Sequence, residues 1–220
     1  AGVTQTRNLT TITDLDGYIG TNVTSIYIGS NVTSIGSSAF YNCTALTSVN
    51  IPDSVTSIGS SAFQNCTSLT SIVIPDSVET IGSSAFYYCT ALTSITIPDS
   101  VTSIESATFG SCSSLTSVTI GNSVTSIGSF AFYFCGILTS ITIGNSVETI
   151  GGSAFSGCSS LTSITIPDSV STIGSFAFSQ CSILATINCL ATTAPALGSN
   201  PFAGVAATEI HVPVGATGYG

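Results

Sequence analysis

A 23-residue repeat constrains the fold of this chain more than any other feature of its sequence. Phe, Cys and Leu each return at that step, and no insertion interrupts the series between about Val23 and Leu184. One unit is too short to bury its own apolar residues, so the units must stack into an elongated solenoid with a continuous core. The recurring positions are Phe40, Phe63, Phe86, Phe109, Phe132, Phe155 and Phe178; Cys43, Cys66, Cys89, Cys112, Cys135, Cys158 and Cys181; and Leu46, Leu69, Leu92, Leu115, Leu138, Leu161 and Leu184.

Each unit divides into segments with different expected conformations. The L-x-x-I-x-I stretch places β-branched residues between inward apolar positions, which predicts a strand. Pro-Asp or Gly-Asn then turns the chain, and V-x-x-I sends a second apolar pair inward, as at Val101 and Ile104. Gly59 and its equivalents are expected to allow a bend that a side chain would hinder. The S-S-A-F-x-x-C segment is expected to form a short helical turn.

These residues resemble a known family. The pattern L-x-x-[IV]-x-I-P-x-S-V-x-x-I-G-x-x-A-F-x-x-C is similar to the BspA-like leucine-rich repeats, most clearly at residues 32–40 and 51–63. The resemblance covers about residues 23–215. It implies a right-handed, mainly β leucine-rich-repeat solenoid, with a parallel sheet on the concave face and short turns or helical segments on the convex face. It also implies a bacterial or protist surface protein that looks like an adhesin.

The chain is expected to have three parts: an imperfect N-terminal cap (1–22), seven regular repeats (23–183), and a distorted terminal coil with a tail (184–220). Phe202 follows Phe178 by 24 residues instead of 23, which indicates the distortion. Neither end carries a charged amphipathic helix, and weakly capped coils expose strand edges and apolar side chains. We therefore expect copies of the chain to associate end to end, in a contact that can propagate into a filament.

Charged residues are scarce, at 5% of the chain, against about 25% in ordinary soluble domains. Arg7 is the only basic residue, so the surface cannot neutralise a row of phosphates, which excludes nucleic acid as a partner. The same scarcity disfavours docking on anionic lipid. No apolar run approaches the ~18–20 residues that cross a bilayer, so membrane insertion is not expected. The small residue Ala1 would suit a mature N-terminus after signal cleavage, which favours a secreted or cell-surface location.

The cysteine ladder offers disulfides, metal binding or free thiols as alternatives. Equivalent atoms in adjacent coils lie about 4.8 Å apart, close enough to suggest bridges. However, stacked side chains point in parallel, and the seven cysteines of the ladder cannot pair fully among themselves. Cys189 stands apart, at the inward strand position held by Ile166 one unit earlier. Buried free thiols are favoured, and zinc is disfavoured because His211, the only histidine, is remote in sequence.

Acidic and amide residues form a second ladder at the turn after the strand. Their oxygens could bind Ca²⁺, but the Asp-to-Asn exchanges would remove ligand charge. Hydrogen bonds from each side chain to its own turn are therefore favoured, and no cofactor is expected. The ladder comprises Asp53, Asp76, Asp99, Asn122, Asn145 and Asp168.

Threonine forms two further ladders that should face outward from the parallel sheet. Solvated Thr that simply favours β structure is the plainest interpretation. A flat Thr array could instead order water and bind ice, pack against another copy, or carry O-linked sugar. The ladders are Thr47, Thr70, Thr93, Thr116, Thr139 and Thr162, which follow Leu, and Thr96, Thr119, Thr142 and Thr165, which separate the paired apolar strand residues.

Five asparagines head N-x-[ST] sequons, namely Asn8, Asn22, Asn31, Asn42 and Asn65. In a eukaryotic source some would carry glycans on exposed loops, whereas in a bacterial source they would have no meaning.

Catalysis has little support from the sequence. The motif G-x-S-x-G is absent, and Asp14 and Asp16 are interpreted as part of a polar turn.

We therefore expect a non-enzymatic extracellular structural or adhesive protein. Its partners would be other copies of itself, an extracellular protein or a glycan. The alternatives are a protein that binds ice or another regular surface, and the stalk fragment of a larger adhesin that binds a host or the matrix.

Overall fold

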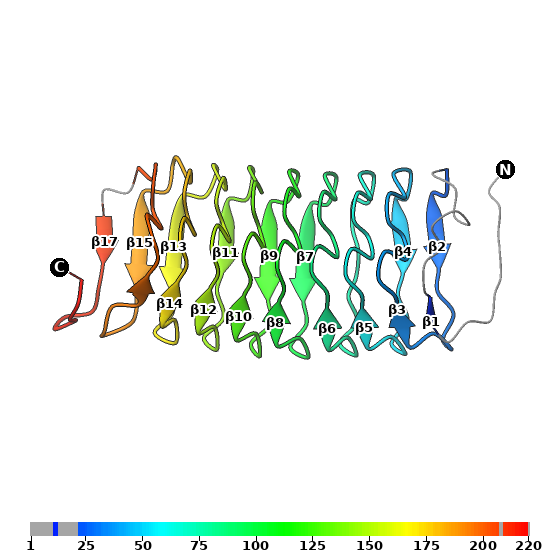
Figure 1. Cartoon of the computed structure of the whole chain (residues 1–220), viewed down its shortest axis with the longest axis horizontal. Helices are drawn as coiled ribbons and strands as arrows, with labels where there is room; N and C mark the ends of the chain where they lie inside the picture. Colours follow the sequence, from blue (N-terminus) through cyan, green and yellow to red (C-terminus); the bar gives the residue numbers. More distant parts are fainter. Residues whose placement is uncertain (1–10, 13–21, 207–208, 220) are drawn as a thin grey trace.

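The computed structural model describes residues 11–12, 22–206 and 209–219, which form one β-solenoid of about eight turns. The coils lie side by side along the long axis of the molecule (Figure 1). We call its two principal surfaces the sheet face, formed by the strand Ser94–Ile97 and its equivalents in the other coils, and the turn ridge, formed by residues 107–114 and their equivalents.

Most coils contribute two strands. The strands of the sheet face are β2 (Ser25–Tyr27), β4 (Ser48–Asn50), β7 (Ser94–Ile97), β9 (Ser117–Ile120), β11 (Ser140–Thr142), β13 (Ser163–Ile166), β15 (Thr186–Cys189) and β17 (Glu209–His211). A second row of two-residue strands comprises β1 (Thr11–Ile12), β3 (Ser34–Ile35), β5 (Ser57–Ile58), β6 (Thr80–Ile81), β8 (Ser103–Ile104), β10 (Ser126–Ile127), β12 (Thr149–Ile150), β14 (Thr172–Ile173) and β16 (Ala196–Leu197).

The strands of the sheet face pair in parallel in the register of the repeat. Ile95 of β7 pairs with Val118 of β9, which pairs with Ile141 of β11. Side chains along β7, β9 and β13 alternate between exposed and buried, as strand geometry requires. Residues 71–74 keep the alternation without an assigned strand, since Ile72 and Ile74 are buried and Val73 is exposed. The predicted parallel strands are confirmed.

The V-x-x-I segment turns a second apolar pair into the core, as expected from the sequence. Val101 and Ile104 are both buried. The segment also contributes the two-residue strands, which pair in parallel from coil to coil, as Ile104 of β8 does with Ile127 of β10. A hydroxyl adds a further link between coils, because Ser77 Oγ donates to the carbonyl of Val55 at 2.7 Å.

The S-S-A-F-x-x-C segment forms turns, and the helical turn expected there is not found; the described residues contain no helix. Ser61 and Asn65 adopt left-handed backbone conformations, with φ of 55° and 61°, and a right-handed helix cannot pass through such residues. Their N–H groups donate to the next coil, to Ser83 O and Tyr87 O, both at 2.9 Å. Bonds between coils thus replace those of a helix.

Close approach of adjacent coils, and not the bend expected from the sequence, explains the recurring glycine. A Cβ at Gly59 would lie 2.5 Å from the backbone nitrogen of Ser37, and one at Gly82 would lie 2.5 Å from that of Ser60. The glycine therefore lets adjacent coils approach closely. Glu105 takes this position in one coil, where its carboxylate accepts a hydrogen bond from the Ser103 hydroxyl.

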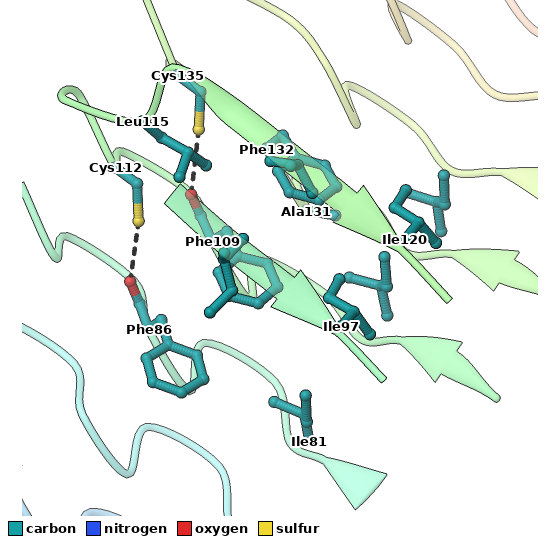
Figure 2. Packing of buried hydrophobic residues seen from close by; sticks show 14 of the residues in the cluster. Ile81, Phe86, Ile97, Phe109, Cys112, Leu115, Ile120, Ala131, Phe132 and Cys135 are labelled. Carbon is teal, nitrogen blue, oxygen red and sulfur yellow. Dashed lines mark hydrogen bonds between the residues drawn. The ribbon is translucent and has the colours of Figure 1, made fainter. Parts of the chain in front are cut away.

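The core is a stack of aromatic rings that runs along the solenoid, with aliphatic side chains packed around it (Figure 2). Phe109 has no exposed surface. Its ring centroid lies 5.4 Å from that of Phe86 and 5.5 Å from that of Phe132, with interplanar angles of 1° and 10°. Phe202 continues the stack, 5.4 Å from Phe178, although 24 residues separate the two. The terminal coil therefore absorbs one extra residue without interrupting the ladder.

Candidate binding surface

The sheet face presents rows of small hydroxyl side chains at the register of the repeat. Its first row is serine at Ser94, Ser117, Ser140 and Ser163, and its second is the predicted ladder Thr96, Thr119, Thr142 and Thr165; all eight are exposed. Along β7, β9 and β11, successive members of each row lie on adjacent, hydrogen-bonded strands. The two rows therefore form a regular surface that is polar but uncharged.

The two threonine ladders differ in how their hydroxyls are used. Thr116 Oγ1 donates to the carbonyl of Thr93 at 3.0 Å, and Thr47 Oγ1 donates to that of Thr24 at 2.8 Å. Within the described part of the chain, the hydroxyls of Thr96, Thr119, Thr142 and Thr165 have no such partner. Members of the first ladder thus fasten one coil to the next, whereas the second keeps its donors for solvent or a ligand.

The rows change character toward both ends, a change that was not predicted from the sequence. The register places Tyr27 and Asn50 in the threonine row at one end, and Asn188 and His211 at the other. Val73 holds the same position 23 residues before Thr96. Val73 is 78% exposed and Tyr27 is 83% exposed. The repeat could have predicted them, because each of these residues lies a multiple of 23 positions from the threonines of the row.

The cysteine ladder lies in the core and contains no disulfide. All eight cysteines are free and buried. Cys112 Sγ donates to the carbonyl of Phe86 and Cys135 Sγ to that of Phe109, both at 3.3 Å (Figure 2). Burial raises the pKa of Cys89 and of Cys135 from 9.0 to about 12, because the interior disfavours a thiolate. These thiols act as buried hydrogen-bond donors between coils.

The acidic turn ladder is exposed, at Asp53, Asp76, Asp99, Asn122, Asn145 and Asp168. The Asp99 carboxylate accepts a hydrogen bond of 2.6 Å from the backbone N–H of Asn122, one coil further on, so it spans coils instead of closing its own turn. His211 Nε2 lies 3.3 Å from Glu209 Oε2, both at the surface. In the described ranges, no three His, Cys, Asp or Glu side chains gather as metal ligands would.

Of the predicted sequons, Asn22, Asn31 and Asn42 are exposed and Asn65 is half-buried. Asn42 and Asn65 both have positive φ and lie in the turn segments. Asn8 falls outside the described residues, as do Asp14 and Asp16. No helix within the described ranges has the length and apolar character needed to traverse a bilayer.

Comparison with known proteins gives the fold a family. A family model described as "BspA type Leucine rich repeat region (6 copies)" matches residues 10–127 and 79–209. No curated protein matches the chain significantly.

Three solved bacterial structures share the architecture. A leucine-rich repeat protein from Bacteroides ovatus is 28% identical, with a TM-score of 0.71 over 87% of this chain and 61% of that one. A leucine rich cell surface protein from Faecalibacterium prausnitzii is 31% identical, with a TM-score of 0.55 over 86% of this chain and 60% of that one. A leucine-rich repeat protein from T. pallidum is 30% identical, with a TM-score of 0.57 over 82% of this chain and 75% of that one.

The chain thus spans about 60% of the length of the first two of these proteins. The family model matches most of the chain, in two overlapping segments. The chain belongs to the BspA-type leucine-rich repeat family.

Proposed function

We propose that this chain is the repeat region of an extracellular, non-enzymatic surface protein that adheres to other molecules through its sheet face. The observation that carries the proposal is the double row of exposed Ser and Thr hydroxyls between β7 and β13. The similarity to a protein described as a cell surface protein supports the location. That similarity covers 60% of the relative, so it supports the location and does not identify a partner.

A row of hydroxyls with free donors suits a partner that binds through repeated weak polar contacts. Each hydrogen bond to a neutral group contributes about 0.5–1.5 kcal/mol after its exchange with water. Useful affinity therefore requires several coils to act together, which the register provides. An extracellular protein or a glycan offers the matching carbonyls, amides and hydroxyls.

The test adds charge to the sheet face and, separately, elsewhere. Thr119→Lys combined with Thr142→Lys places two ammonium groups on the sheet face, and Thr102→Lys combined with Ser123→Lys places them at exposed positions outside it. Surface plasmon resonance on immobilised collagen, laminin and mucin measures binding. We expect the first variant alone to lose binding. Absence of binding by the parent chain, or equal loss in both variants, would contradict the proposal.

A regular-surface ligand, ice in particular, is a second candidate function. Thr96, Thr119, Thr142 and Thr165 offer unpartnered hydroxyls at the strand spacing of about 4.8 Å. The row is interrupted by Val73 on one side and by Asn188 on the other, which limits its length. Measurable thermal hysteresis in the parent chain, abolished in Thr119→Lys with Thr142→Lys, would support ice binding; its absence would remove this candidate.

End-to-end association of copies is proposed for the terminal coil. A hollow of about 420 Å³ there is lined by apolar side chains that include Leu197, Phe202 and Ile210. Leu197 and Ile210 are 58% and 63% exposed. Strand β17 (Glu209–His211) and strand β2 (Ser25–Tyr27) each have three residues. Pairing of β17 with β2 of a second copy would therefore extend the sheet. Sedimentation velocity across a concentration series should show growing species, whereas a monomer at every concentration would refute the association.

A further inference from the structure

Half-exposed aromatic side chains gather on the turn ridge, the surface formed by residues 38–45, 61–68, 84–91, 107–114, 130–137, 153–160 and 176–183. Tyr88, Phe130, Phe134 and Phe176 are each 43–47% exposed. Backbone hydrogen bonds stack these segments on one another, as from Phe134 N to Ser156 O at 2.8 Å. The aromatic side chains therefore share one continuous strip of surface, separate from the sheet face.

The aromatic side chains occur in alternate coils. The coil of Phe86 carries Tyr87 and Tyr88, and the coil of Phe132 carries Phe130, Tyr133 and Phe134. The coil between them has Ala107, Gly110 and Ser111 at the corresponding ridge positions, and the coil after them has Ser153, Ser156 and Gly157. Phe176 begins the next aromatic coil.

Glycines of the intervening coils receive the rings. A Cβ at Gly110 would lie 2.9 Å from Cδ2 of Tyr87, and a Cβ at Gly157 would lie 3.0 Å from Cδ1 of Phe134. Tyr133 is held between two rings of its own coil, with centroids 5.4 Å from Phe130 and 4.4 Å from Phe134 and nearly perpendicular planes. The rings are thus fixed in place while almost half of each exposed side chain remains in contact with water.

The fold does not require aromatic residues at these positions. Tyr88, Phe130, Phe134 and Phe176 all have φ between 54° and 62°, a conformation that is uncommon and costly for bulky residues. Other coils place Ser, Ala, Asn, Gln or Gly at the same two positions of the repeat. Large apolar residues in a left-handed conformation, left half-exposed, point to a role in binding instead of in folding.

The charge of the ridge selects the class of ligand. None of the seven ridge segments contains Asp, Glu, Lys or Arg, although the chain carries a net charge of −9. An acidic ligand would be repelled by the chain as a whole, and a cationic one would find no carboxylate on the ridge. The partner that fits is therefore uncharged.

The exposed area selects the size of the ligand. An aromatic side chain buries about 150–250 Å² when fully covered, so each half-exposed ring offers roughly 90 Å². Four such rings offer roughly 350–400 Å², about half of the ~800 Å² per partner that a standard protein interface buries. Ile137 and Ile183 of the same ridge segments, 45% and 50% exposed, widen the strip. Its apolar area still stays below that of a standard interface, so it suits a short ligand better than a second copy of the chain.

We propose that the turn ridge between Tyr87 and Phe176 binds a neutral oligosaccharide, at a site distinct from the proposed adhesive sheet face. The π-face of an aromatic ring is negative and attracts the polarised C–H groups on one face of a sugar ring. Hydroxyl and amide groups beside the rings, including those of Ser111, Ser153 and Gln180, can bond to the sugar hydroxyls. The aromatic coils recur at two strand spacings, about 10 Å, so several sugar rings can be bound together.

The repeat supplies its own conservative substitutions for the test. Phe130→Ser with Phe134→Asn gives one aromatic coil the residues found at the same positions in the coil of Phe63, namely Ser61 and Asn65. These residues have φ of 55° and 61° there, so the variant is expected to keep the fold, which far-ultraviolet circular dichroism checks. The matched control, Thr102→Lys with Ser123→Lys, alters exposed positions outside both the ridge and the sheet face, and Thr119→Lys with Thr142→Lys tests the sheet face separately.

Isothermal titration calorimetry with cellohexaose, maltohexaose and chitohexaose measures binding to the parent chain and the three variants. We expect at least one hexasaccharide to bind the parent, and affinity to fall by roughly tenfold or more in the ridge variant, as for truncated anchor residues, but not in the control. No binding of any of the three sugars, or equal binding by the folded ridge variant, would overturn the proposal. A parent dimer that the ridge substitutions convert to a monomer would also overturn it, in favour of self-association. Loss of binding in the sheet-face variant but not in the ridge variant would also overturn the proposal, because it would assign the sugar to the sheet face.

Discussion

Replacing Phe109 with alanine removes a ring from the middle of the stacked ladder. The ring is wholly buried and lies against Phe86 and Phe132, at centroid distances of 5.4 and 5.5 Å. A buried Phe→Ala change costs about 3–5 kcal/mol, through lost transfer free energy and the cavity left behind. Because stacked partners are lost on both sides, we expect a cost in the upper part of that range.

Phe202→Ala provides the matched comparison at the end of the ladder. Phe202 is only half-buried and stacks on one described ring, that of Phe178 at 5.4 Å. Less apolar area is lost and one stacked pair disappears instead of two, so we expect about half the cost of Phe109→Ala, roughly 2 kcal/mol. The difference between the two variants isolates the contribution of the interior position.

Urea denaturation followed by far-ultraviolet circular dichroism gives the free energy of unfolding of each variant. A repeat array can unfold in parts, so native-state hydrogen exchange at the amides of Phe86, Phe109 and Phe132 should be measured as well. The cost should appear there as locally reduced protection. If Phe109→Ala destabilises the chain no more than Phe202→Ala, the reasoning from burial and two-sided stacking fails.

Three further outcomes are expected. Cys112 and Cys135 should resist alkylation in the folded chain and react fully in urea, and intact mass before and after unfolding checks this; a mass that shows disulfides would contradict it. Because burial raises the pKa of Cys89 and Cys135 from 9.0 to about 12, the unfolded chain releases thiol protons first, so stability in denaturant titrations should fall as pH rises above about 9; a constant midpoint from pH 8 to 11 would refute this. Thr116→Val removes an exposed 3.0 Å hydrogen bond and should cost less than about 1 kcal/mol in urea titrations; a cost of several kcal/mol would contradict this.

The strands and the core could be predicted because they depend on a pattern that recurs at a single step. An apolar residue such as Ile95 must face inward in every coil if it does so in one, since β7 and β9 pair in register. The turn segments could not be predicted in the same way. Ser61 and Asn65 donate their N–H groups to residues 22 positions further on, and neither residue alone distinguishes a left-handed conformation from a helical one. Local propensity therefore suggested a helix where bonds between coils decide.

The candidate surfaces were predictable to different degrees. The 23-residue repeat placed Thr119 and Thr142 on the sheet face. It did not distinguish their unpartnered hydroxyls from those of Thr93 and Thr116, which bond to the preceding coil. The aromatic residues of the ridge are evident in the sequence. Their exposure could not be predicted, because Phe130 and Phe134 adopt a left-handed backbone conformation. That conformation arises only when coils stack, so it could not be read from one unit.

The side-chain bonds between coils span a nearly constant number of residues. Hydroxyls reach carbonyls 22 or 23 residues earlier, as from Ser77 and Thr116, and the thiol of Cys112 reaches one 26 residues earlier. Each coil thus meets the same kinds of neighbour whatever the total number of coils. A gene could therefore gain or lose a whole 23-residue module by unequal recombination and still encode a protein with every internal contact satisfied. The reach of such a protein would change in increments of about 4.8 Å per module, so its length is a trait that can vary without a change of fold.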